Sequence, residues 1–379
     1  MAAAQLPDSS RLSSRFEPSA LRFALAWLLP LSVGAAALAV SPWAAWAVTF
    51  GWQVLLALLE QVPGLQHSPP AVRASLWHRL CVRLHVPLQA ALLAAALWLL
   101  AQGEVSVAAA VALGLALGGI TGSQGITFAH ELGHSRSRFD RLLAWALMAS
   151  VLYAHFMVEH YRGHHVRAAT FDDPASARRG ESLWRFLPRT LRGSWISAWR
   201  LEAAQLAQLN RGWSTSALML ATVAQAVWLL ALLVWLGPLA IVFWVVQAGY
   251  AVFLLEAINY VEHYGLVRQQ QRGRHEPFGL HHAWNADHLV TNSVIANLQR
   301  HSDHHMQAWK PYAELRPLPG PQLPTGYAGC LFLASVPRLW FAAMEPRLAA
   351  VQAQRAGPGA QGAASAAASA TSAAASGAA

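Results

Sequence analysis

Nine histidines stand in four short segments of the sequence, and imidazole is the commonest metal ligand in proteins. The segments are HELGH, EHYRGHH, NYVEHYG and LQRHSDHH, and their histidines are His130, His134, His160, His164, His165, His263, His301, His304 and His305. Most neighbours within a segment are three or four residues apart, which places side chains on one face of a helix. Brought together, so many rings would hold two metal ions rather than one. We therefore expect an enzyme whose metal ligands are these nine histidines.

The first two segments indicate how the predicted ligands are divided between two metal ions. His130 and His134 are four residues apart, so both project from the same face one turn apart. His160 and His164 repeat that spacing. His165 lies about a third of a turn further round the helix. It can therefore reach a second ion.

Acidic residues accompany the histidines. Four carboxylates each lie within two residues of a predicted ligand: Glu131, Glu159, Glu262 and Asp303. Such groups orient metal-bound imidazoles by accepting the second ring N–H, but each could equally be a solvated charge at a helix end. Three further histidines could stand behind the ligands or in a polar loop: His281, His282 and His288.

The composition indicates which elements must position these residues. Hydrophobic residues make up 55% of the chain and charged residues 12%, with a mean hydropathy of +0.32, which is too apolar for a water-soluble domain of this size. Runs with few charges, long enough to cross a hydrocarbon core of about 30 Å, occur at 21–39, 42–60, 85–102, 105–128, 215–236 and 238–259. Very short connections join these runs in pairs. The sequence thus predicts an all-α membrane protein with six transmembrane helices in three hairpins.

The arginines predict the orientation of these helices. They fall on one side of the arrangement, within 73–83, 136–211 and 268–274, and the hairpin tips on the other side carry no Lys or Arg. The positive-inside rule then places both termini and the long loops of a multi-pass membrane protein in the cytoplasm. The histidine segments lie on the same side, in a cytoplasmic helical cap. In so apolar a chain, the net charge of +9 gives little support to nucleic-acid binding.

The chain divides into three parts. Residues 1–19 are polar and predict a flexible cytoplasmic arm, residues 20–350 form the membrane domain, and residues 357–379 are an Ala/Ser/Gly tail that predicts disorder. The apolar stretch 141–158 lies between two histidine segments and is short for a span. If it crossed the membrane, those segments would lie on opposite faces, so we expect an interfacial or re-entrant helix.

Two other classes of metal protein are less consistent with this pattern. HELGH alone matches the H-E-x-x-H motif of zinc proteases, but a protease needs one further ligand and leaves the other three segments unexplained. A metal transporter would place histidines along a path through the bilayer, whereas these gather at one edge. Sulfur ligands are disfavoured because Cys81 and Cys330 form no CxxC pair.

The four histidine segments, in this order and with these separations, resemble those of the integral-membrane alkane 1-monooxygenases. These are bacterial non-haem di-iron hydroxylases related to membrane fatty-acid desaturases and to xylene monooxygenase. The likeness covers roughly residues 120–345 and includes HHAWNADH and LPTGYAG. NYVEHYGL and LQRHSDHH favour the alkane hydroxylases over the two related groups. HELGH departs from the family pattern because Ser135 and Arg136 follow it where a lysine is usual.

The resemblance implies a reaction, a cofactor and partners. An alkane 1-monooxygenase hydroxylates the terminal methyl of an n-alkane to a primary alcohol, using O2, two irons held by the nine histidines, and electrons from rubredoxin and its NADH-dependent reductase. Arginines on the cytoplasmic face would offer docking charge for an acidic electron carrier, or would contact anionic lipids: Arg136, Arg138, Arg162, Arg167, Arg178 and Arg179. The alternative function is a membrane fatty-acid desaturase or a xylene-monooxygenase-like hydroxylase with the same di-iron site.

An alkane has no polar group by which it can be held, so its position must come from an apolar channel. Four glycines in the fourth predicted span could let a chain pass close to the helix backbone: Gly114, Gly118, Gly119 and Gly122. Helix packing in the bilayer is the other explanation for these glycines.

Overall fold

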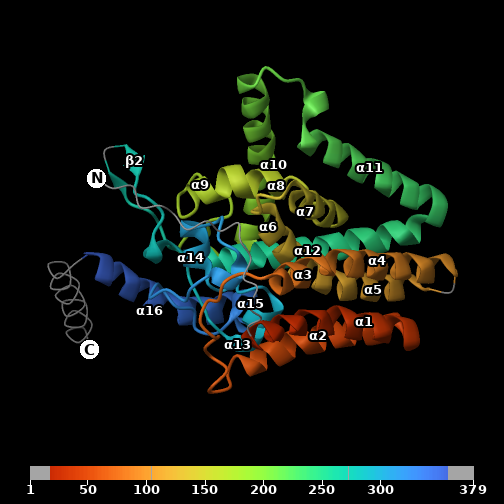
Figure 1. Cartoon of the computed structure of the whole chain (residues 1–379), viewed down its shortest axis with the longest axis horizontal. Coiled ribbons are helices and arrows are strands. Elements are labelled where there is room, and N and C mark those ends of the chain that lie inside the picture. The colour runs from red at the N-terminus through yellow and green to blue at the C-terminus, as the bar shows by residue number, and fades with distance from the viewer. Residues whose placement is uncertain (1–17, 104, 272, 357–379) are drawn as a thin grey trace, which may run out of the picture.

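The computed structural model describes residues 18–103, 105–271 and 273–356, and these are predominantly helical (Figure 1). Within them, helical segments long and apolar enough to cross a membrane are Pro18–Ala39, Pro42–Leu59, Leu76–Ala101, Val107–Gly133, Ala217–Leu236 and Pro238–His263. The prediction of an all-α chain with six candidate spans is confirmed. The predicted tail 357–379, and all but the last two residues of the predicted arm 1–19, lie outside the described residues.

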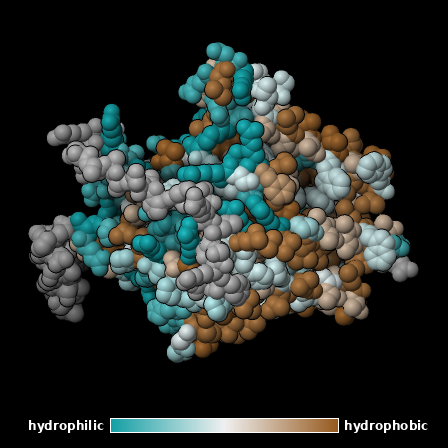
Figure 2. Space-filling model, viewed as in Figure 1, coloured by the Kyte–Doolittle hydropathy of each residue, from teal (hydrophilic) through white to brown (hydrophobic). Residues whose placement is uncertain are grey.

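The long apolar helices lie together at one end of the molecule. Five of them run side by side in the right-hand half of Figure 1: α1 (Leu28–Ala39), α2 (Pro42–Leu59), α4 (His85–Ala101), α5 (Val107–Ile120) and α12 (Pro238–His263). Hydrophobic residues dominate the same half of the visible surface, whereas hydrophilic residues gather on the left (Figure 2). An apolar belt is what a bilayer requires, because polar side chains lose their hydration in its hydrocarbon core. Helices suit the same environment because they satisfy their backbone polar groups internally.

Capping residues begin the spans at short connections. The Ser41 hydroxyl accepts a hydrogen bond from the Ala44 N–H at 3.1 Å, and Ser106 does the same for Ala109 at 3.2 Å. Gly237, at φ +80°, separates α11 (Ala217–Leu236) from α12 in a conformation that favours glycine. These connections agree with the pairs of runs seen in the sequence, and the three-hairpin arrangement itself stays a prediction.

Glycines let α5 and the turn that follows it lie close to α12. A Cβ atom at Gly118 would lie 2.7 Å from the backbone oxygen of Gln247, and one at Gly122 would lie 2.8 Å from the Cα atom of Ala251. Real side chains do not approach so closely, so these two positions need glycine for helix packing. Packing therefore explains Gly118, whereas Gly122 serves packing and also lines the cavity described below.

Two short helices belong to candidate spans: α3 Leu76–Arg83 precedes α4, and α6 Thr127–Gly133 follows α5. The helices outside the candidate spans are α7 Arg138–Ser150, α8 Phe156–Glu159, α9 His165–Arg167, α10 Leu183–Gln208, α13 Leu289–Val294, α14 His301–Met306, α15 Tyr327–Ser335 and α16 Pro337–Ala356. A small hairpin pairs β1 (Gln270–Gln271) with β2 (Arg274–His275). The 13 residues of α7 extend only about 20 Å, which is too short for a span.

Two π-helical turns interrupt the helices that carry histidines. One, Thr121–Ile126, lies between α5 and α6, and the other, His160–His164, lies between α8 and α9. A π-turn inserts one extra residue and rotates the side chains that follow, and such turns are frequent at functional sites.

Candidate metal centre

Five of the histidines form one group, which we call the five-histidine group. Their ring nitrogens lie within 4.8 Å of one another: His130, His134, His160, His165 and His304. The Nε2 atoms of His130 and His304 are 2.9 Å apart. Those of His160 and His165 are also 2.9 Å apart. Nitrogens that bind one ion at about 2.1 Å are about 3 to 4 Å from each other, so this spacing fits a shared metal ion.

The other four histidines form a second, fully buried group, the four-histidine group. Its members are His164, His263, His301 and His305. His263 ends α12, and its Nε2 atom lies 3.2 Å from that of His301. Helix α14 contributes to both groups, because His304 belongs to the five-histidine group and His301 and His305 belong to the four-histidine group. The groups adjoin, since the ring centroids of His165 and His305 are 4.5 Å apart.

The π-turn His160–His164 changes which histidines belong to the same group, compared with the prediction from their spacing. In an α-helix His164 would lie on the same face as His160. The extra residue in the turn instead brings His165, five positions on, against His160, while His164 joins the four-histidine group. The prediction that His165 reaches the second ion while His164 accompanies His160 was therefore wrong. All nine predicted ligands still come together.

The state of the ring nitrogens fits a metal site. Nε2 of His134, His164 and His305 is buried and has no hydrogen-bond partner among the described residues, which is unfavourable unless the atom binds something else. Among the histidines of both groups that lie outside the candidate spans, burial lowers the pKa of every ring but one well below its usual range. A lowered pKa keeps a ring neutral, as a metal ligand must be. These rings are His134, His160, His165, His301, His304 and His305. A buried set of neutral nitrogens suits a divalent transition metal such as iron or zinc.

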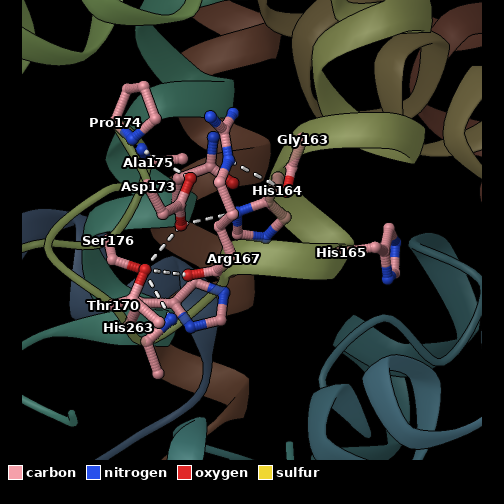
Figure 3. Close-up of polar contacts among 12 residues, drawn as sticks. Gly163, His164, His165, Arg167, Thr170, Asp173, Pro174, Ala175, Ser176 and His263 are labelled. Carbon is pink, nitrogen blue, oxygen red and sulfur yellow. Dashed lines mark hydrogen bonds and ion pairs between the residues drawn. The ribbon is translucent and has the colours of Figure 1, made fainter. Parts of the chain in front are cut away.

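His164 is the exception, because a carboxylate stands behind it. Its Nδ1 atom lies 2.9 Å from Oδ2 of Asp173 (Figure 3). Burial disfavours both charges, but the pairing raises the pKa of His164 and lowers the pKa of Asp173. The sequence analysis missed Asp173, because it lies outside the histidine segments and nothing in the sequence distinguishes it from its neighbour Asp172.

One of the four predicted carboxylates meets a ligand. Oε1 of Glu262 lies 3.2 Å from Nδ1 of His301, within ion-pair distance although the angle is not that of a hydrogen bond. The same oxygen accepts a hydrogen bond from the Tyr327 hydroxyl at 2.7 Å. Glu262 is therefore placed to orient His301, as predicted for a carboxylate next to a ligand.

The other three predicted carboxylates have structural partners instead. Glu131 accepts a hydrogen bond from the backbone N–H of Tyr312, Glu159 pairs with Arg167, and Asp303 pairs with Lys310. Within the described ranges none of the three forms an ion pair with a histidine of either group. They fix the segments that carry the ligands rather than the ligands themselves.

The three undecided histidines divide into different environments. The backbone oxygen of His282 lies 3.4 Å from Nδ1 of His263, and the His282 ring pairs with Glu276 at 3.0 Å. His282 therefore contacts the predicted ligand His263 through its main chain. His281 is exposed, and His288 belongs to neither group.

An apolar cavity of about 260 Å³ leads away from the centre. His130, His160 and His301 form its inner end, and most of its wall is aliphatic or aromatic. At the other end lie Phe50 and Phe332, which are 46% and 41% exposed and whose ring centroids are 6.5 Å apart. Phe50 lies in the middle of α2, so this end faces the lipid-exposed side of the spans.

Comparison with known proteins gives consistent results. Residues 105–333 match the family model for fatty acid desaturases. The chain is 37% identical over 318 residues to the alkane 1-monooxygenase of Ectopseudomonas oleovorans, covering 80% of this chain and 79% of that protein. It is 44% identical over 248 residues to alkane 1-monooxygenase 1 of Pseudomonas aeruginosa, covering 63% and 64%. Identity to the xylene/toluene monooxygenase hydroxylase component of Pseudomonas putida is lower, 29% over 249 residues, covering 65% and 66%.

Proposed function

The chain belongs to the fatty acid desaturase family and, within it, to the alkane 1-monooxygenases, and from this premise we propose that it hydroxylates the terminal methyl of n-alkanes to primary alcohols. One observation carries the proposal. Two adjoining groups of buried histidines close the inner end of an apolar cavity whose other end faces the lipid side of a multi-pass membrane protein. A substrate without polar groups, dissolved in the bilayer, suits such a site.

We propose that each histidine group holds one iron ion. The five-histidine group and the four-histidine group would supply all the protein nitrogens, and their unpartnered Nε2 atoms support this assignment. When bound, the irons supply the activation of O2, of which one oxygen atom enters the C–H bond and the other leaves as water after two electrons and two protons arrive.

The cavity determines which carbon reacts. Its mostly apolar wall makes van der Waals contacts that have no preferred direction, so the shape of the cavity holds the alkane. The alkane must therefore enter with one end first. Ile126 and Phe156 line the cavity with His130 and His160, so a chain that enters end first would present its leading methyl to the rings. The apolar wall also excludes water from the reacting end. Terminal selectivity thus comes from positioning.

We propose that electrons come from rubredoxin and its NADH-dependent reductase, and that the centre faces the cytoplasm from the bacterial inner membrane. Three of the arginines predicted for docking are already paired with carboxylates: Arg162 with Glu202, Arg167 with Glu159, and Arg179 with Glu345. The exposed arginines Arg136, Arg138 and Arg178 are the better candidates for an acidic carrier.

Whole cells that co-express this chain with rubredoxin provide the test. Given a series of n-alkanes, they should form 1-alkanols, identified by mass spectrometry. His305→Ala should abolish the product, and His281→Ala, at an exposed ring outside both groups, should not. Unsaturated products from an acyl thioester, or oxidation of xylene without oxidation of alkanes, would contradict the proposal and support the desaturase or the xylene-type alternative.

A further inference from the structure

Asp173 is held in one orientation by its own loop. Its side chain is fully buried, and its Oδ2 atom accepts a hydrogen bond from the Ser176 hydroxyl at 2.6 Å (Figure 3). Its Oδ1 atom accepts one from the backbone N–H of Ala175 at 3.2 Å. Ser176 is fixed in turn, because its oxygen accepts from the Ala169 N–H at 2.8 Å. A carboxylate restrained in this way is a fixed acceptor for whatever ring faces it.

The ring that faces this acceptor is that of His164. An ionised carboxylate can only accept hydrogen bonds, so the proton of the neutral ring sits on Nδ1, 2.9 Å from Oδ2 of Asp173. Nε2 then keeps its lone pair and points, without a hydrogen-bond partner among the described residues, into the four-histidine group. A carboxylate partner both orients a ligating ring and makes it more basic.

The five-histidine group lacks this support. Within the described residues no Asp or Glu forms an ion pair with any of its rings. The four-histidine group has two nearby carboxylates, Asp173 behind His164 and Glu262 at 3.2 Å from Nδ1 of His301. Two cations bound side by side would therefore have unequal surroundings, because only one of them has negative charge behind its ligands.

We propose that Asp173 is a positioning residue that fixes His164 as a metal ligand, so that the four-histidine group binds its ferrous ion more tightly than the five-histidine group, despite having one ligand fewer. This inference rests on the proposed di-iron function. Losing such an outer partner weakens metal binding by about 10- to 100-fold.

The test compares two neighbouring substitutions in the full-length chain, purified in detergent and loaded with Fe(II) without oxygen. Asp173→Asn keeps the size of the side chain and removes its charge, and Asp172→Asn makes the same change at an exposed position. Each protein is dialysed against increasing concentrations of a ferrous chelator, and the iron per chain is measured. The unmodified chain and Asp172→Asn should release iron in two steps. In Asp173→Asn the later step should move to an about 10- to 100-fold lower chelator concentration.

A third variant assigns the steps to the groups. His134→Ala removes a ligand from the five-histidine group, so it should weaken the early step and leave the later one unchanged. Combined with Asp173→Asn, it should show the same shift of the later step. If Asp173→Asn does not fold, Ser176→Ala loosens the carboxylate without removing it and should shift the later step in the same direction by less.

Each contrary result has a distinct meaning. Release of both irons in one step by the unmodified chain would overturn the inequality of the two sites. Curves for Asp173→Asn that match those of Asp172→Asn, or for Ser176→Ala that match the unmodified chain, would overturn the role of Asp173. An unmodified chain that never holds two irons would instead overturn the proposed function.

Discussion

The metal centre and the cavity that leads to it are built in opposite ways. In the centre, rings are set by directional partners, such as Asp173 behind His164 and the main chain of His282 behind His263. In the cavity, most contacts are apolar and have no direction. The centre thus depends on the identity of each residue, and the cavity depends on the volume that its residues leave. Substitutions in the two regions should differ in how their effect depends on substrate length.

The largest effect is expected in the centre. His301→Ala removes a proposed ligand that also borders the cavity. Loss of a mere outer partner of a ligand lowers metal affinity or activity by about 10- to 100-fold, so loss of the ligand itself should lower activity by more than about 100-fold. The loss should be equal for short and long n-alkanes and should accompany a loss of iron. Turnover across a chain-length series, with iron content measured in parallel, checks both. An activity loss restricted to one chain length would show that the two regions are not separable.

A change in the cavity wall should have an effect that depends on chain length. Leu29 is 4% exposed, lines the cavity and belongs to neither histidine group. Leu29→Phe should shorten the available space and lower activity on the longest accepted alkanes about tenfold, because a pocket discriminates one methylene by about 10- to 200-fold. Shorter alkanes should be oxidised at the usual rate.

Leu28→Phe is the matched control for this variant. The neighbouring side chain is 47% exposed and does not line the cavity, so the same substitution there should leave the chain-length profile unchanged. Equal losses on short and long alkanes in Leu29→Phe would contradict the assignment of the cavity as the substrate channel.

A helix-packing change outside the cavity should leave the chain-length profile unchanged. A Cβ at Gly118 would lie 2.7 Å from a backbone oxygen of α12, and overpacking of this kind costs about 1–3 kcal/mol. Gly118→Ala should therefore lower the thermal unfolding temperature, while the relative rates on short and long alkanes stay the same. Gly249→Ala, where a Cβ in the interior of α12 meets nothing within 4 Å, should leave stability undiminished or raise it slightly. A shifted chain-length preference in Gly118→Ala would place this glycine in the channel after all.

The smallest effect is expected at the surface that would receive the electron donor. Attraction between exposed arginines and an acidic carrier is screened by salt over about 8–10 Å. Rubredoxin-supported turnover should therefore fall severalfold as ionic strength rises, equally for all alkanes. Turnover that is insensitive to ionic strength would argue against docking through Arg136, Arg138 and Arg178.

The contrast between the two regions also explains what the sequence could predict. The nine histidines that come together were evident because helical spacing and residue type carry the signal, and the six candidate spans were evident because hydropathy does. The sequence did not reveal that His165 joins the five-histidine group and His164 the four-histidine group. This division depends on a π-turn, which is set by packing rather than by a local motif. Asp173 meets its partner through a loop whose path only the fold determines. The cavity depends on how helices far apart in the sequence leave space between them, which no single segment encodes.

The central claim is that nine histidines in two adjoining groups hold a pair of iron ions. Elemental analysis of the purified full-length chain, loaded with Fe(II) without oxygen and freed of loosely bound metal, tests it most directly. Two irons per chain are predicted, falling to one or fewer in His301→Ala. One zinc per chain, or less than one iron in the unmodified protein, would contradict the account.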